Sequence, residues 1–396
     1  MKLLVLLFTI LFALSAYAQE KSTSLSEVQK VVNDTLASKW YEKIQLRGYA
    51  HFRYNRLLES NRDYLNSSND KSIGDKKGFF LRRARLTFFG EVSDRVYIYI
   101  QPDYAQDAGD SGQNYFQIRD AYFDYALTPD KEWRIRSGVS KVPFGFDNLQ
   151  SSSNRPALDR SDAINTAAPN ERDTGVFLMY APSEIRKRFK DLTSNNLKGS
   201  GDYGMFAIGA YNGQTLNKGE KNNDLHRIVR LTYPFKLQSG QFIEASLQAY
   251  EGQYRATTPD KDFYDQRTAA SLIYYPQPFG FQMEYNIGQG PDYNKTSGNV
   301  ENRELKGGYV QVNYQTILNE DRYFPYVRYQ EYEGGRKLDN GNHMETRELE
   351  FGTEWQPNSA LELTVAYAIS DRKVESATST TDETGQLLRL QAQFNY

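Results

Sequence analysis

Cysteine is absent from the 396 residues, which excludes disulfide bonds and every mechanism that depends on a thiol. No charge of one sign prevails either, since 48 Lys and Arg stand against 50 Asp and Glu, and nucleic acid is therefore not an expected partner. Histidine occurs only three times, and no serine has the spacing of a hydrolase elbow or triad. We expect no enzyme and no cofactor.

Long apolar runs are missing after residue 18, and the mean hydropathy is −0.71. A transmembrane helix needs about 20 consecutive apolar residues, so none is expected. Two classes remain: a soluble secreted protein, or a β-barrel whose contact with lipid is spread over alternate residues.

The first 18 residues have the pattern of a cleaved secretory signal: Lys2, an apolar stretch over 3–14, and Ala16-Tyr17-Ala18 as the cleavage site. Residues 19–43 then predict a short periplasmic segment, with a helical stripe within 22–43. The predicted barrel fills 44–396.

Aromatic side chains are abundant, with 30 Tyr and 22 Phe. Tyrosine has an apolar ring and a polar tip, so it suits the two interfacial girdles of a membrane barrel. A β-rich soluble protein is also rich in aromatics, which leaves both classes open at this point.

Apolar and polar residues alternate in many segments. At the end of the sequence Leu388, Leu390 and Ala392 alternate with Arg389 and Gln391. Successive side chains of a strand point to opposite faces, so such segments have one apolar and one polar face. A final strand that ends on an aromatic residue resembles the last strand of Gram-negative outer-membrane proteins.

Short links alternate with long polar ones, as short periplasmic turns and long external loops do in outer-membrane barrels. We predict an all-β fold, a transmembrane antiparallel β-barrel of about sixteen strands with both termini on the periplasmic side. The strands are expected near 44–56, 79–92, 95–104, 115–127, 132–141, 173–180, 203–213, 225–235, 241–254, 265–275, 279–288, 306–316, 322–332, 344–356, 359–370 and 385–396. Residues 181–202 do not fit this rhythm, because they should form a short turn but are long, basic and partly helical in pattern.

The stretch WRIRSGVSKVPFGFDNLQSSSNRPALDR, followed by NERDTGV, resembles the phosphate-selective porin O and P family, as do LRRARLTFFGEV and QIRDAYFDYAL. The resemblance covers most of 44–396. It implies a sixteen-stranded homotrimeric porin of the Gram-negative outer membrane, in contact with lipid and lipopolysaccharide. It also implies that the third external loop, here 141–172, folds inward and narrows the channel.

The same resemblance implies that cationic side chains on this loop and the adjoining wall attract anions. The matching positions are Lys141, Arg155, Arg160 and Arg172, and the preceding strand adds Arg134 and Arg136. The loop departs from a simple anion trap, because it also carries acidic residues: Asp147, Asp159, Asp162, Glu171 and Asp173.

The alternation also assigns charges to the lumen. Early strands contribute Arg47, Arg53, Arg83, Arg85, Arg134 and Arg136, and later strands contribute Glu244, Glu284, Glu348, Glu350, Glu354 and Glu362. We expect these rows to face one another across the channel. The alternative is that they pair locally and stiffen the wall. A metal site is not expected, since DYAQDAGDSGQN lacks the closing Glu of an EF-hand.

The leading hypothesis is passive diffusion of small hydrophilic solutes, with anions or phosphate preferred. The alternatives are a plugged or binding outer-membrane barrel, a non-selective or sugar-type channel, and a soluble secreted β-protein that binds glycans.

Overall fold

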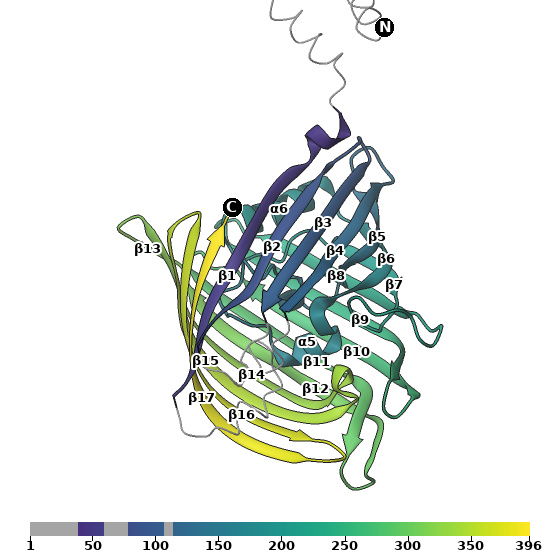
Figure 1. Ribbon diagram of the computed structural model, residues 1–396. Coiled ribbons are helices and arrows are strands. Elements are labelled where there is room, and N and C mark those ends of the chain that lie inside the picture. The colour runs from purple at the N-terminus through teal and green to yellow at the C-terminus, as the bar shows by residue number, and fades with distance from the viewer. Residues whose placement is uncertain (1–38, 59–77, 107–113) are drawn as a thin grey trace, which may run out of the picture. The chain divides into compact units, whose positions relative to one another are not determined.

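Sixteen antiparallel strands follow one another around a closed barrel (Figure 1). This computed structural model describes residues 39–58, 78–106 and 114–396. The predicted signal peptide and most of the predicted 19–43 segment lie outside these residues. The strands are β1 (Gln45–Leu57), β2 (Gly78–Glu91), β3 (Val96–Gln106), β4 (Asn114–Ala126), β5 (Trp133–Lys141), β6 (Arg172–Tyr180), β7 (Phe206–Tyr211), β8 (His226–Lys236), β9 (Phe242–Ala256), β10 (Lys261–Tyr274), β11 (Phe279–Asn294), β12 (Asn299–Tyr314), β13 (Thr316–Leu318), β14 (Asp321–Arg336), β15 (Asn342–Asn358), β16 (Leu361–Glu375) and β17 (Thr380–Asn395).

The short helices lie between strands, apart from one that precedes β1. They are η1 (Trp40–Lys43), α4 (Phe146–Leu149), α5 (Asp162–Ala167), η2 (Pro169–Glu171), α6 (Ser183–Ser194) and η3 (Lys337–Asp339). No helix in the described ranges is both long and apolar enough to cross a bilayer.

Closure depends on β1, which pairs with β2 on one side and with β17 on the other. β12 and the three-residue β13 share one position, because both pair with β14. The seventeen labelled strands therefore correspond to sixteen strand positions around the barrel, as predicted. A closed barrel leaves no unpaired sheet edge, which is the condition for crossing a bilayer with strands.

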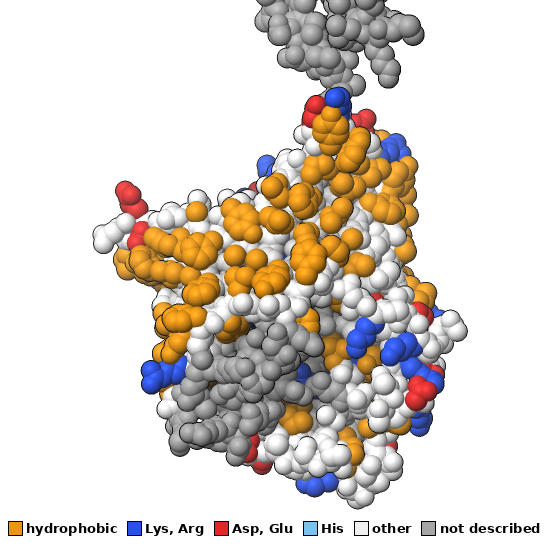
Figure 2. Space-filling model, in the orientation of Figure 1, with side chains coloured by type: hydrophobic (Ala, Val, Ile, Leu, Met, Phe, Trp, Pro, Cys, Tyr) orange, Lys and Arg blue, Asp and Glu red, His pale blue; other side chains and the backbone are white. Residues whose placement is uncertain are grey.

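The side chains alternate between the two faces of the wall, as β8 illustrates. Ile228, Arg230 and Thr232 are buried toward the inside, whereas Val229 and Leu231 are exposed on the outside. Figure 2 shows apolar side chains spread over the outer face of β1 to β4 with few charges among them. Lipid accepts the apolar face, and charged groups are kept out of the apolar band because exposure to acyl chains is costly. Outward charged side chains such as Arg227 and Glu251 lie closer to the ends of the strands with the long loops.

We call the end of the barrel with the short links the turn end; it also holds Gln45 and Tyr396. The opposite end is the loop end. There the strands continue further than predicted: β11 and β12 run to a tight turn at 295–298, whereas a loop over 289–304 was expected. The apolar alternation ceases where lipid ceases, but the backbone ladder needs no apolar face and continues.

Substituting Leu247 by Arg tests the assignment of the outer face. Leu247 lies near the middle of β9 with 55% of its side chain exposed. An arginine near the bilayer midplane costs roughly 2–4 kcal/mol, so we expect the folding free energy in lipid vesicles to fall by that amount. Leu237→Arg, in the turn after β8, is the matched control and should cost about 0–1 kcal/mol. Equal small losses at both positions would contradict the assignment.

Candidate functional site

The loop between β5 and β6 (residues 142–171, the β5–β6 loop) carries α4, α5 and η2 and is largely buried. Its apolar side contains Val142 and Phe144, which pack on inward side chains of β6 to β10 such as Phe177 and Tyr211. The rings of Phe144 and Tyr250 meet edge to face, 5.1 Å apart. The inner wall of β6 to β10 is unusually apolar, and the loop covers it.

The polar side of the β5–β6 loop is bound to other walls of the barrel. Glu284 of β11 accepts hydrogen bonds from the backbone N–H groups of Phe146 (2.7 Å) and Asp147 (3.1 Å). Asp159 forms an ion pair with Arg389 of β17, at 2.7 Å. The loop therefore has polar contacts with inward side chains of strands remote from β5 and β6 in sequence.

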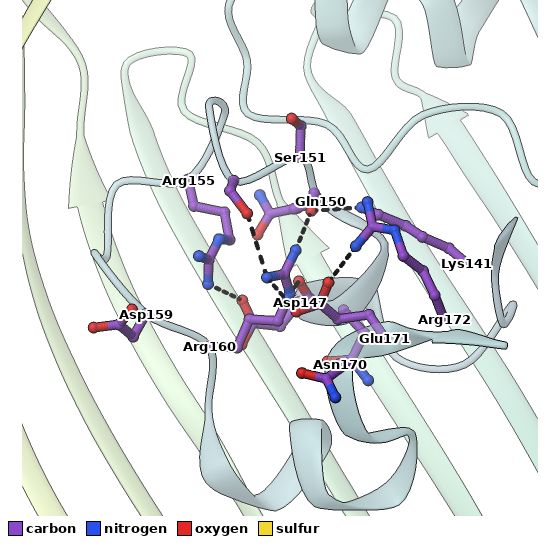
Figure 3. A network of polar contacts seen from close by, with 12 residues as sticks. Lys141, Asp147, Gln150, Ser151, Arg155, Asp159, Arg160, Asn170, Glu171 and Arg172 are labelled. Atoms are coloured by element: carbon purple, nitrogen blue, oxygen red, sulfur yellow. Dashed lines mark hydrogen bonds and ion pairs between the residues drawn. The ribbon is translucent and has the colours of Figure 1, made fainter. Parts of the chain in front are cut away.

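Glu171, the last residue of the loop, is the centre of an arginine cluster (Figure 3). It pairs with Arg119 at 3.0 Å, Arg160 at 2.6 Å and Arg172 at 2.5 Å. Arg172 also donates to both carboxylate oxygens of Asp120. Burial would raise the pKa of Glu171, but the guanidinium groups outweigh it and hold the pKa well below its usual range. Glu171 is therefore ionised at neutral pH and neutralises part of the cluster.

Substituting Glu171 by Gln should release this positive charge. The variant keeps the shape of the side chain but removes one negative charge from three arginines. A unit charge about 5 Å from a passing ion in water is worth about 0.8 kcal/mol, or roughly fourfold in permeability. We expect the anion-to-cation permeability ratio to rise by about that factor in planar bilayers. Glu184→Gln, on exposed α6, is the control. A fall in the ratio would contradict this account of the cluster.

The two predicted arginines of β5 each have a carboxylate partner. Arg134 pairs with Asp202 at 2.8 Å. Arg136 donates two parallel hydrogen bonds to Asp124 of β4, at 2.8 and 2.9 Å. The bidentate pair fixes the guanidinium plane of Arg136 against the wall, whereas Arg134 is held by a single hydrogen bond to the segment that contains Asp202.

Two further predicted residues support the loop itself. Lys141 donates to the carbonyl oxygens of Leu149 (2.7 Å) and Gln150 (2.8 Å). Arg155 lies 3.7 Å from Asp147. The six predicted residues are thus close to the loop or to β5, but they do not form one ring of free cations.

A cavity of about 870 Å³ lies at the turn end, and we call it the basic vestibule. It is lined by inward side chains of β1 to β5, by the loop, by α6 and by residues 199–203. Eleven Lys and Arg line it against five Asp and Glu. Four of the six predicted residues are among them: Arg134, Arg136, Lys141 and Arg172. Arg155 and Arg160 are not. Arg160 borders a much smaller crevice toward β14 and β17.

The sequence reasoning missed the contribution of α6 to this cavity. Arg186, Lys187 and Lys190 line the vestibule, while Ile185 and Leu192 are buried and do not line it. The basic and apolar stripes within 181–202 were the available signal.

The rest of this segment, residues 195–205, makes contacts far from its neighbours in sequence; we call 181–205 the β6–β7 link. Lys198 is buried and pairs with Glu354 of β15 at 2.5 Å, with its ammonium 4.5 Å from the ring of Phe324. Asn196 donates to Gln356 at 2.5 Å. The segment that did not fit the expected rhythm of short turns thus fills part of the lumen.

The expected opposition of basic and acidic rows is wrong in its acidic half. Three of the six glutamates pair within that half: Glu350 with Arg389, Glu348 with Arg372 at 3.5 Å, and Glu244 with Arg230 at 3.6 Å. Inward arginines of the same strands, which the earlier sorting left out, neutralise them. The asymmetry that remains is the excess of cations in the vestibule.

Metal binding has no support in the described part of the chain, where no group of three or more His, Asp or Glu is placed to hold an ion. Asp103 pairs instead with Arg85 at 3.0 Å.

The family comparison decides the identity. The family model "Phosphate-selective porin O and P" matches residues 58–267 and 256–396. The chain belongs to this family. It is therefore a porin, a passive diffusion channel of the Gram-negative outer membrane.

Solved outer-membrane channels share the fold of this porin. The outer membrane channel DcaP of Acinetobacter baumannii is 17% identical with a TM-score of 0.57, covering 89% of this chain and 97% of that one. OmpF of Salmonella typhi is 15% identical with a TM-score of 0.56, over 89% and 97%. An anion-selective porin from Comamonas acidovorans is 10% identical with a TM-score of 0.51, over 89% and 99%. No curated protein matches this chain.

Proposed function

We propose that this porin passes small anions in preference to cations and selects them in the basic vestibule. The supporting observation is the charge of that cavity, eleven basic against five acidic side chains. Arg47, Lys187 and Lys190 line it and form no ion pair with any other described residue. Like charges around a low-dielectric channel concentrate counter-ions and exclude co-ions.

The six residues Arg134, Arg136, Lys141, Arg155, Arg160 and Arg172 have two proposed roles. Arg134, Arg136, Lys141 and Arg172 present positive charge to the solute, because they line the vestibule. Arg155 and Arg160 hold the β5–β6 loop through Asp147 and Glu171. The loop is the proposed constriction, since it contacts both β11 and β17.

Assembly is part of the same proposal: a homotrimer in lipid and lipopolysaccharide, acting in transport and not in catalysis. The similarity to a porin named as anion-selective supports the preference for anions. A plugged barrel is the second candidate, because the β5–β6 loop and the β6–β7 link both occupy the lumen.

A salt series tests the proposal. Single-channel conductance of the purified porin is measured in potassium chloride, lithium chloride and potassium acetate. We expect lithium chloride to change the conductance little and potassium acetate to lower it, because acetate is the slower anion. Conductance that follows the cation would refute anion preference, and the absence of any conductance step would favour the plugged barrel.

A further inference from the structure

The helix α4 of the β5–β6 loop is held at both ends by a charged side chain of the barrel wall. At its beginning, the backbone N–H groups of Phe146 and Asp147 donate to the carboxylate of Glu284 on β11. At its end, two carbonyl oxygens accept hydrogen bonds from Lys141, the last residue of β5. The strands β6 to β10 lie between β5 and β11 in the sheet. The helix therefore connects two well-separated parts of the wall.

The carboxylates of the loop itself are bound to arginines of the wall. The carboxylate of Asp147 lies 2.9 Å from the guanidinium of Arg328. That of Asp159 lies 2.7 Å from the guanidinium of Arg389. Burial would raise the pKa of Asp159, but the guanidinium groups of Arg53 and Arg389 outweigh it and hold the pKa well below its usual range. Mild acid therefore leaves this attachment of the loop intact.

Glu284 differs from these carboxylates, because backbone N–H groups and not an ion pair balance its charge. Its side chain is fully buried, and within the described ranges it forms no ion pair. Arg230 of β8 faces it but pairs with Glu244, at 3.6 Å. The other titratable groups that face Glu284 are Tyr309 of β12 and Asp147 of α4. A change in the protonation of Glu284 therefore acts on the loop directly, through the two N–H groups.

A protonated Glu284 cannot accept both hydrogen bonds. The ionised carboxylate offers two acceptor oxygens, one to Phe146 and one to Asp147. After protonation one of these oxygens belongs to a hydroxyl, which is itself a donor and meets an N–H group. That buried N–H group is then left without a good acceptor, which is costly. Residues 143–146 would lose their attachment to β11, whereas the side chain of Asp147 would stay paired with Arg328.

We propose that Glu284 is a proton-controlled latch of the constriction. In its ionised form it fixes residues 143–146 to β11, and in its protonated form it releases them into the lumen. This inference rests on the proposed role of the β5–β6 loop as the constriction, but not on the preference for anions. The alternative, that Glu284 only stiffens the wall, predicts that this segment behaves alike in mild acid and at neutral pH.

Single-channel recordings at pH 8 and pH 4 test the latch, since the ordinary pKa of a glutamate is about 4.3. We expect a steady open-channel current at pH 8 and a severalfold noisier one at pH 4. Glu284→Gln puts an amide donor against one of the two N–H groups and should be noisy at both pH values. Glu362→Gln is the matched control and should respond to acid as the original protein does. Glu362 is also an inward glutamate without an ion pair among the described residues, but it accepts its hydrogen bonds from β17.

Labelling of a thiol follows the segment without any current. The sequence has no cysteine, so Val142→Cys introduces a single thiol, next to residues 143–146 at a position that is 1% exposed. At pH 8 we expect a charged thiol reagent to react about tenfold faster when Glu284→Gln is added, because the covering segment opens more often. Adding Glu362→Gln instead should leave the rate unchanged.

An original protein that is equally steady at both pH values would overturn the inference, as would an acid response of the same size in Glu284→Gln. If Glu284→Gln does not fold, Glu284→Asp takes its place, because its carboxylate is one methylene short of the two N–H groups. The failure of the proposed function looks different. Faster labelling without added noise would refute the role of the loop as the constriction, and a preference for potassium over chloride would refute the anion preference alone.

Discussion

The variant Arg134→Ala/Arg136→Ala is expected to lower the anion-to-cation permeability ratio by roughly sixteenfold. Each arginine removed takes one positive charge from the vestibule, worth about 0.8 kcal/mol on an ion about 5 Å away, or roughly fourfold. Both partners remain: Asp124 loses its counter-charge, whereas Asp202 keeps its ion pair with Arg186. The effect is measured as the shift of the reversal potential in planar bilayers under a potassium chloride gradient.

Two controls distinguish the effect of lost positive charge from the effect of a disturbed barrel wall. Arg136→Ala/Asp124→Ala removes the ion pair without changing the net charge, so the ratio should stay within about twofold of the original. Arg227→Ala removes a cation from the outer face, where 74% of the side chain is exposed, and should change nothing. An unchanged ratio in the double-arginine variant would show that these residues only build the wall.

Replacing residues 183–201 by a short Gly-Asn turn is expected to raise the single-channel conductance several-fold. The β6–β7 link occupies lumen that a short turn would leave to water. Ile185, Phe189 and Leu192 pack there with side chains of β9 and β10, and Lys198 reaches across to Glu354. Conductance grows with the cross-section of the water-filled path. Removing the β6–β7 link widens this path, so the single-channel conductance should rise.

The substitution Lys198→Ala tests the same segment by removing one side chain instead of the whole segment. Breaking a buried ion pair by removing one partner costs about 3–5 kcal/mol, because the other charge stays buried alone. We expect the link to detach from β15 and the conductance to become larger and noisier. Glu184→Ala, whose side chain is 74% exposed, should leave the current unchanged. Unaltered conductance in both the turn replacement and Lys198→Ala would mean that the link does not restrict the path.

The strands could be predicted closely because lipid imposes a pattern on the sequence. β8 and β5 begin and end within one residue of their predicted bounds, since an apolar residue is required at every second position. The loop-end parts of β11 and β12 could not be predicted, because the apolar alternation stops there while the pairing of the two strands continues. The β6–β7 link shows the other limit: its helical stripe is visible in sequence, but its contact with Glu354 joins residues 156 positions apart.

The sequence predicts where the candidate site residues lie, but it does not predict their ion-pair partners. Alternation places Arg134 and Arg136 on the inner face of β5 without knowledge of the fold. Their partners depend on strand register and on the link: Arg136 stands directly across from Asp124, and Arg134 meets Asp202. Tyrosines such as Tyr97 and Tyr99 line the vestibule, although tyrosines were expected in the interfacial girdles. The composition gives the number of tyrosines but not the face of the strand on which each one lies.

The reversal potential of the unmodified porin under a tenfold potassium chloride gradient tests the central claim most directly. If the basic vestibule selects the permeating ion, the potential will have the sign set by chloride diffusion. A potential with the sign set by potassium would contradict the account.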